Sequence, residues 1–175
     1  MNWLTKNLPP GDDPMGADDD QKAAWDLFRK AYERQMKGEF EEAIKLYTDS
    51  IDLYPTAEAY TFRGWTHSFM GLLDEAIEDC HRAIAVDPDF GNPYNDIGAY
   101  LIEQDKLDEA IPWLTRAIQA KRYDCYCFPH FNLGRIYEHQ GAWTKAVASY
   151  RQAYAANTDY VIALQAANRL QGLLD

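Results

Sequence analysis

Residues 75–83 read EAIEDCHRA. Similar segments stand at 42–50 (EAIKLYTDS), 109–117 (EAIPWLTRA) and 145–153 (KAVASYRQA). The alanines at their second position, Ala43, Ala76, Ala110 and Ala146, are 33, 34 and 36 residues apart. Self-similarity at a nearly constant period indicates an array of structural repeats. The fold is therefore expected to be a chain of like units.

Three further sets of residues keep the same phase as these alanines. Each unit has a small residue, then a turn position seven residues later, then a large apolar residue two positions after the turn. The small residues are Ala31, Gly64, Gly98 and Gly134, the turn positions are Gly38, Gly71, Asp105 and Gly141, and the apolar residues are Phe40, Leu73, Leu107 and Trp143. Each unit thus predicts two helices of about 14 residues joined by a tight turn, with small residues where the helices cross closely.

This spacing resembles the tetratricopeptide repeat (TPR) family, whose unit of 34 residues has small residues at places 8, 20 and 27 and a proline at place 32. The resemblance covers four repeats, at about 24–56, 57–90, 91–124 and 127–160; Pro55 and Pro88 close the first two. Among the departures from the pattern are Arg63 and His67. The resemblance implies an all-α fold, a right-handed superhelical solenoid of helix-turn-helix repeats.

The two ends and one joint of the chain fall outside the repeat pattern. Residues 1–20 hold five aspartates and three prolines, so a disordered acidic tail is expected before an array over 21–160. Residues 161–175 predict a capping helix whose apolar side, including Val161 and Ile162, covers the open end of the array. Residues 121–127 contain two extra residues, which either extend the preceding helix or form a longer loop.

The composition limits the kinds of partner and the cellular compartment to be expected. The chain has 17 Lys and Arg against 28 Asp and Glu, a net charge of −11. Such acidity argues against binding to nucleic acid and to anionic membranes, and no apolar run is long enough for a membrane span. The start has no apolar signal region and the cysteine count of three is odd, so a cytoplasmic location is expected.

The sequence shows no pattern typical of catalysis. Cys125, Cys127 and His130 form a C-x-C-x-x-H cluster, but no second pair completes a zinc site. Whether this cluster has a role is left open. No phosphate-binding glycine loop or nucleophile motif is present. We therefore expect no catalytic residue, no metal and no cofactor, and predict that the protein is not an enzyme.

The resemblance implies a binding surface instead. In TPR arrays the first helix of each repeat, helix A, lines a concave groove. An independent observation supports this surface: Phe28 and Tyr32 form a second apolar stripe on one helix, and a second stripe needs another neighbour. Aromatic residues make up 14% of the chain. The predicted peptide-binding groove consists of Trp25, Phe28, Arg29, Tyr32, Phe62, Trp65, Phe69, Asn95, Phe131, Asn132 and Arg135.

The expected partner is a protein or peptide with an apolar face and a basic rim, because complementary charge speeds encounter. Co-chaperone members of the family grip acidic chaperone tails with a clamp of cations and amides. The clamp places here hold Phe28, Tyr32, Phe62, Asn92 and Asp96, so we predict no clamp binding, and Asp96 is expected to repel a carboxylate. Two alternatives stay open: a dedicated chaperone for a secreted client, as in type III secretion, and a self-assembling scaffold.

For the scaffold alternative, the protein is expected to be a monomer or a weak homo-oligomer. Trp3, Leu4 and Leu8 of the N-terminal segment could occupy the aromatic groove of the same chain or of a neighbour.

Overall fold

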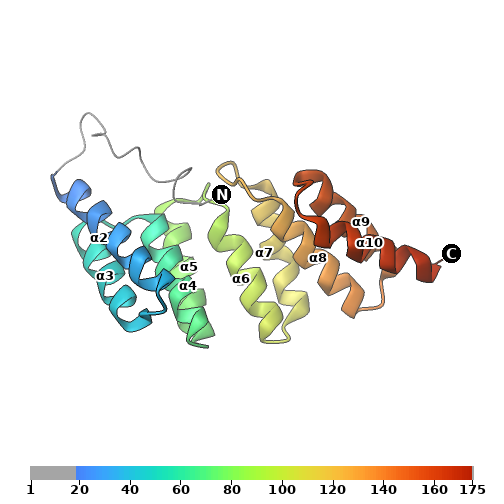
Figure 1. The fold of residues 1–175 in the computed structure, drawn as a ribbon, viewed down its shortest axis with the longest axis horizontal. Coiled ribbons are helices and arrows are strands. Elements are labelled where there is room, and N and C mark those ends of the chain that lie inside the picture. Colours follow the sequence, from blue (N-terminus) through green and yellow to red (C-terminus); the bar gives the residue numbers. More distant parts are fainter. Residues whose placement is uncertain (1–18, 175) are drawn as a thin grey trace. The chain divides into compact units, whose positions relative to one another are not determined.

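A computed structural model describes residues 19–174, and every regular element in that range is an α-helix (Figure 1). The helices are α2 (Asp19–Met36), α3 (Phe40–Leu53), α4 (Ala57–Phe69), α5 (Leu73–Val86), α6 (Asn92–Glu103), α7 (Leu107–Gln119), α8 (Cys127–His139), α9 (Trp143–Ala156) and α10 (Val161–Leu174). The all-α class and the helix-turn-helix alternation predicted from the repeat spacing are confirmed.

The chain divides into two compact units, Met1–Pro55 and Thr56–Asp175, which we call unit 1 and unit 2. In unit 1, α2 packs against α3. In unit 2, each helix from α4 to α10 packs against the next, and in addition α4 contacts α6 and α6 contacts α8. Among the A helices of the three repeats in unit 2, α6 therefore lies next to both α4 and α8.

The four predicted turn positions share one backbone conformation. Gly38, Gly71 and Gly141 have positive φ values of 78°, 77° and 69°, and Asp105 has a φ of 60°. This left-handed region costs an L-residue free energy that glycine avoids, and aspartate tolerates it better than most residues. The backbone geometry explains why this position holds glycine in the first, second and fourth repeats and aspartate in the third.

The small residues mark close helix crossings, as predicted. A Cβ atom added to Gly98 would lie 2.5 Å from Cδ2 of Leu114, and one added to Gly134 would lie 2.5 Å from the ring of Tyr150. The main core of unit 2 is built around such crossings, from Ala76, Cys80, Ile97, Tyr100, Leu101, Ala110, Leu114, Leu133 and Ile136.

The joint after the third repeat is the longer loop, not an extended helix, because α7 ends at Gln119 and α8 begins at Cys127. Arg122 in this loop pairs its backbone with Asp89 and Gly91 at 2.9 and 3.0 Å. Its guanidinium lies 2.6 Å from Oδ2 of Asp87 and 2.7 Å from Oε1 of Glu58, and 4.1 Å from the ring centre of Phe90. The loop is thus held against the start of the second repeat and the end of its second helix.

The ends agree with the sequence in part. The capping helix exists as α10, but it buries Ala163, Ala167 and Leu170, whereas Val161 and Ile162 are exposed and do not cover the end of the array as expected. The helix α2 already begins at Asp19, so residues 19 and 20 are helical and not part of a tail. The expectations for residues 1–18, including Trp3, Leu4 and Leu8, lie outside the described residues.

Candidate binding surface

The predicted groove residues of unit 1 divide by burial. Phe28 is 0% exposed and its ring lies 5.4 Å from that of Tyr47, in an edge-to-face contact between α2 and α3. Tyr32 is also buried. Trp25 is half-buried, and Arg29 is exposed and pairs with Asp26. The structure thus uses Phe28 for packing, away from the surface where the sequence placed it.

In unit 2, α4 presents an aromatic row. The ring centres of Phe62 and Trp65 lie 5.6 Å apart, and those of Trp65 and Phe69 lie 5.4 Å apart. Phe62 is 4% exposed, whereas Trp65 is 40% and Phe69 53% exposed. The row follows from the helix, since residues three and four apart share a face. Trp65 and Phe69 are therefore the surface members, and Phe62 forms their base.

A polar ladder joins α6 to α8. Nδ2 of Asn132 donates to Oδ1 of Asn95 at 3.2 Å, and a guanidinium nitrogen of Arg135 donates to Oδ1 of Asn132 at 3.3 Å. Both asparagines are buried, while Arg135 is exposed. Burial raises the pKa of the neighbouring Asp96 to about 7, against a hydrogen bond from Asn95. Near neutral pH, Asp96 therefore repels a carboxylate less than the sequence suggested.

A second aromatic group lies at the start of α8. The ring of Tyr160 is 5.5 Å from that of Phe128 and 5.2 Å from that of Phe131, both nearly edge to face. Phe131 is among the predicted residues. Tyr160 was missed because it lies in the turn after α9, where the repeat pattern assigns no groove place. We call the combined surface of α4, α6 and α8, together with Tyr160, the helix-A surface. Its members are Trp65, Phe69, Phe128, Phe131, Arg135 and Tyr160, with the two buried amides Asn95 and Asn132 beneath them.

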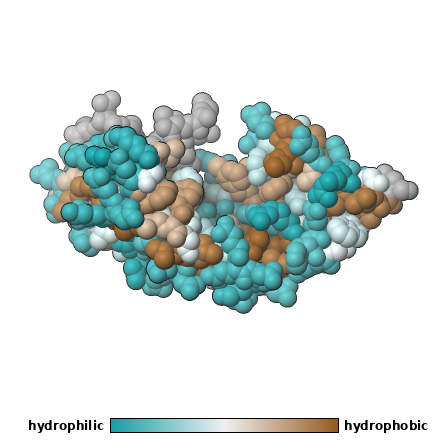
Figure 2. All heavy atoms as spheres, turned by 60° about the horizontal axis from the view of Figure 1, so that its bottom comes forward, coloured by the Kyte–Doolittle hydropathy of each residue, from teal (hydrophilic) through white to brown (hydrophobic). Residues whose placement is uncertain are grey.

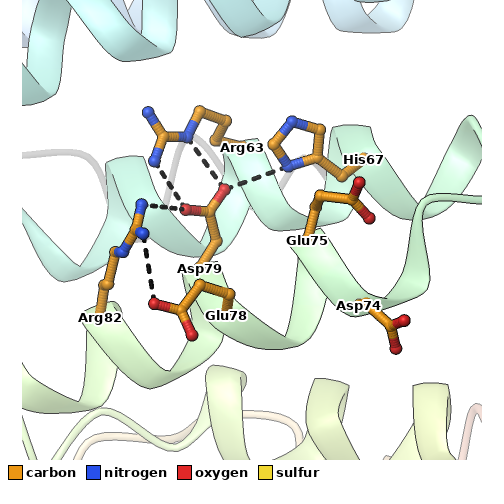
Figure 3. A pocket seen from close by; sticks show the side chains of 7 residues that line it. All are labelled: Arg63, His67, Asp74, Glu75, Glu78, Asp79 and Arg82. Atoms are coloured by element: carbon orange, nitrogen blue, oxygen red, sulfur yellow. Dashed lines mark hydrogen bonds and ion pairs between the residues drawn. The ribbon is translucent and has the colours of Figure 1, made fainter.

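A pocket of about 310 Å³ lies on the α4–α5 hairpin (Figure 3). Its lining residues are Arg63, His67, Asp74, Glu75, Glu78, Asp79 and Arg82. At its base, the Asp79 carboxylate accepts hydrogen bonds from Nε and NH2 of Arg63 at 2.9 and 2.6 Å, and Nδ1 of His67 lies 3.2 Å away. Burial by itself raises the pKa of Asp79, but the hydrogen bonds from Arg63 and His67 outweigh it and hold the pKa below its usual value.

From the sequence alone, Arg63 and His67 are only departures from the repeat pattern. The structure explains them as partners of one buried carboxylate, so we assign this network to the stability of the hairpin.

The cysteine and histidine cluster has no ligand arrangement. Among residues 19–174, no three His, Cys, Asp or Glu side chains are grouped closely enough to hold a metal ion. Burial raises the pKa of the Cys127 thiol and lowers that of His130. None of the helices in the same range is both long and apolar enough to cross a membrane.

Curated relatives match about half of the chain. The "SGT1 homolog" of Oryza sativa subsp. japonica is 37% identical over 89 residues, which is 50% of this chain and 24% of that protein. The "Small glutamine-rich tetratricopeptide repeat-containing protein 2" of Saccharomyces cerevisiae is 33% identical over 89 residues, covering 50% of this chain and 26% of that protein. The "Hsp70-Hsp90 organizing protein 1" of Glycine max is 29% identical over 100 residues, 57% of this chain and 16% of that protein. The chain spans about a quarter or less of the length of these relatives.

Solved structures match over most of the chain. MamA superposes with a TM-score of 0.67 at 25% identity, covering 80% of this chain and 81% of MamA. The pilF protein of Pseudomonas aeruginosa gives a TM-score of 0.81 at 19% identity, over 87% of this chain and 69% of pilF. YrrB, a TPR protein with an unusual peptide-binding site, gives 0.64 at 18% identity, over 90% of this chain and 84% of YrrB.

Two family models, both described as tetratricopeptide repeat, match residues 57–90 and 89–159. These ranges cover the second, third and fourth repeats predicted from the spacing of small residues. The positive-φ turns and the close helix crossings give that spacing its physical basis. The chain therefore belongs to the tetratricopeptide repeat family.

Proposed function

We propose that the protein is an interaction module that binds a segment of a partner protein on the helix-A surface of unit 2. The exposed pair of Trp65 and Phe69 carries this proposal. Two adjacent large rings in water are unfavourable for a monomer, and tryptophan and other aromatic side chains dominate the binding energy of protein interfaces. Figure 2 shows one face of the molecule, on which hydrophobic residues gather in patches between hydrophilic ones.

The polar ladder complements the aromatic pair. An extended segment has backbone N–H and C=O groups that must find partners when the segment is buried. Asn95 and Asn132 are held in fixed orientation by their mutual hydrogen bond, and each side-chain amide both donates and accepts. We propose that these amides position the backbone of the segment while Trp65 and Phe69 contact its apolar side chains. In unit 1, Trp25 and Arg29 remain candidate contacts.

The proposal is tested with the variant Trp65→Ala/Phe69→Ala. Its matched control is Trp143→Ala, which removes a tryptophan of similar exposure, 43%, from the start of α9. Purified proteins are used to capture partners, which are quantified by mass spectrometry, and circular dichroism verifies the fold. The double variant should lose the partners that the control retains. An unchanged partner set in the folded double variant would refute the proposal.

We also propose that the chain does not act as a carboxylate clamp, although one relative is named for organizing Hsp70 and Hsp90. At the clamp places of unit 2, Phe62 is buried and Asp96 carries the only ionisable side chain. Calorimetry with a chaperone tail peptide should give no micromolar binding. Measured micromolar affinity would contradict this.

Self-assembly is a second candidate, favoured by the exposed apolar residues of α10. Ile162, Leu173 and Leu174 are all exposed large side chains on this last helix. A mass measurement by light scattering, repeated with Ile162→Ser/Leu173→Ser, tests this function. A concentration-dependent increase in mass that the variant abolishes would support it, and a monomer at all concentrations would reject it. Captured partners that are secreted clients would instead favour the chaperone alternative.

A further inference from the structure

The α8 end of the helix-A surface has a composition of its own. Phe128 is 41% exposed. Its ring and the ring of Phe131 each stand nearly at right angles to the Tyr160 ring, at interplanar angles of 85° and 77°. Aromatic rings favour such edge-to-face contacts, and an open cluster of this kind offers both ring faces and ring edges to another ring. We call Phe128, Phe131, Tyr160 and the adjacent Arg135 the α8 aromatic surface.

Arg135 brings a cation to this cluster. Its guanidinium donates one hydrogen bond, at 3.3 Å, to the neutral Asn132, and no ion pair between described residues includes it. By contrast, Arg169 pairs with Glu138 at 2.7 Å and Arg122 pairs with two carboxylates. Arg135 lies four residues after Phe131 on α8, so the two side chains share a face of the helix. Burial raises the pKa of the Tyr160 phenol, and the charge of Arg135 opposes that rise.

The charge of the surrounding chain favours an acidic ligand at this end alone. Residues 125–175 contain four Lys and Arg against three Asp and Glu, whereas residues 57–90 contain two against seven. An acidic segment would be repelled by the second repeat and attracted to the fourth, because like charges disfavour encounter and opposite charges promote it. Exposed guanidinium groups bind carboxylates through paired hydrogen bonds.

We infer that the α8 aromatic surface recognises a segment of a partner protein in which an aromatic side chain stands next to one or more carboxylates. The ring contacts Phe128, Phe131 and Tyr160, and the carboxylate pairs with Arg135. This inference rests on the proposed function, since α8 is part of the helix-A surface, and it names the chemistry of the partner at that end. It uses residues of the fourth repeat and requires the aromatic ring, which distinguishes it from an acidic tail held by a clamp.

The test uses synthetic fluorescent peptides in anisotropy titrations with the full chain. The probe carries one central phenylalanine flanked by glutamates. Three matched peptides replace the glutamates by glutamine, the glutamates by lysine, or the phenylalanine by alanine. The protein variants are Arg135→Glu and Phe128→Ala. The control Arg151→Glu makes the same charge change at an exposed arginine of α9, which donates a hydrogen bond to Gln171.

The acidic aromatic probe should bind at least about tenfold more tightly than each matched peptide, and Arg135→Glu should weaken it by about tenfold or more while Arg151→Glu leaves it within about twofold. Binding should weaken as salt rises from about 50 to 300 mM. Amide NMR shifts should appear in 127–139 and 157–162. The inference is overturned if the probe does not bind, if the glutamine peptide binds equally well, or if Arg135→Glu has no effect.

A different result would refute the proposed function itself, namely an unchanged partner set in the Trp65→Ala/Phe69→Ala variant. If neutral aromatic peptides bind and shift the amide NMR signals of α4 and α6, the proposed function is retained and the acidic preference at α8 is rejected.

Discussion

The substitution Asp79→Asn tests whether the buried network of the α4–α5 hairpin stabilises the fold. It keeps the shape of the side chain and removes its charge. The Asp79 side chain is only 3% exposed, and Arg63, which lies against it in a two-point contact, is 11% exposed. The amide of asparagine can accept from one nitrogen of Arg63 but presents an NH₂ group to the other. The change therefore leaves a largely buried guanidinium without its counter-charge.

The expected cost is large for a conservative change. Removing one partner of a buried ion pair destabilises a protein by about 3 to 5 kcal/mol, because the remaining charge stays buried. Arg63 keeps some access to water, so we expect a loss of about 3 kcal/mol in the free energy of unfolding. For a chain of this length, that loss corresponds to a fall in Tm of about 6 to 12 °C.

The assay is urea unfolding followed by circular dichroism, with Asp89→Asn as the control. Asp89 makes the same kind of pair, with Lys121 at 3.2 Å, but both side chains are exposed. Exposed pairs contribute little, so the control should change the free energy of unfolding by less than about 0.5 kcal/mol. A loss below about 1 kcal/mol for Asp79→Asn would show that the Arg63–Asp79 pair does not stabilise the fold.

The pH dependence gives the same network a second test. The pKa of Asp79 is lower in the folded chain than its usual value, so its contribution is fully present above the unfolded pKa of about 3.9 and is lost as pH falls through the folded pKa. The stability difference between wild type and Asp79→Asn should thus persist down to about pH 5 and shrink below about pH 4. A difference that does not shrink below about pH 4 would contradict the ion pair.

Four further substitutions test the close helix crossing, the turn and the loop by urea unfolding. Gly134→Ala should cost about 1 to 3 kcal/mol, because its Cβ would lie 2.5 Å from the Tyr150 ring. Gly172→Ala, at a helical position with open space around it, should instead stabilise the fold by about 0.5 to 1 kcal/mol. Equal effects at the two sites would reject the close helix crossing at Gly134. Asp105→Gly should stabilise by about 0.5 kcal/mol by removing a non-glycine residue from a φ of 60°, and a loss would show that the aspartate side chain matters more than its backbone. Arg122→Ala should cost about 1 kcal/mol and speed amide exchange in 120–126; unchanged exchange would mean that the loop is held by its backbone bonds alone.

Much of the fold could be predicted because its determinants are local. A positive φ or a close crossing admits few residue types, so Asp105 and Gly134 are visible in the sequence at fixed spacing. The exposure of an aromatic residue is different, since Phe62 and Trp65 are equally apolar and lie on one helix, yet only the latter reaches the surface. Their difference depends on which neighbours cover each ring.

Contacts between residues distant in sequence also could not be predicted from the repeat pattern. Arg122 bonds to Glu58 across 64 residues, and the partner of Asp79 is a residue that the repeat pattern treats as an exception. No spacing rule connects such pairs, because only the packing of the helices in the folded chain brings them together. The same holds for Tyr160, which reaches Phe128 from a turn.

The loop that carries Arg122 has a consequence for the cooperativity of unfolding. In repeat arrays each repeat gains its stability from its own interior and from the interface with the next one. Arg122 lies at the end of the third repeat, but it bonds to Glu58 in the first helix of the second repeat and to Asp87 at the end of that repeat's second helix. These bonds strengthen the interface between the second and third repeats, so the two repeats should unfold together even where the rest of the array frays.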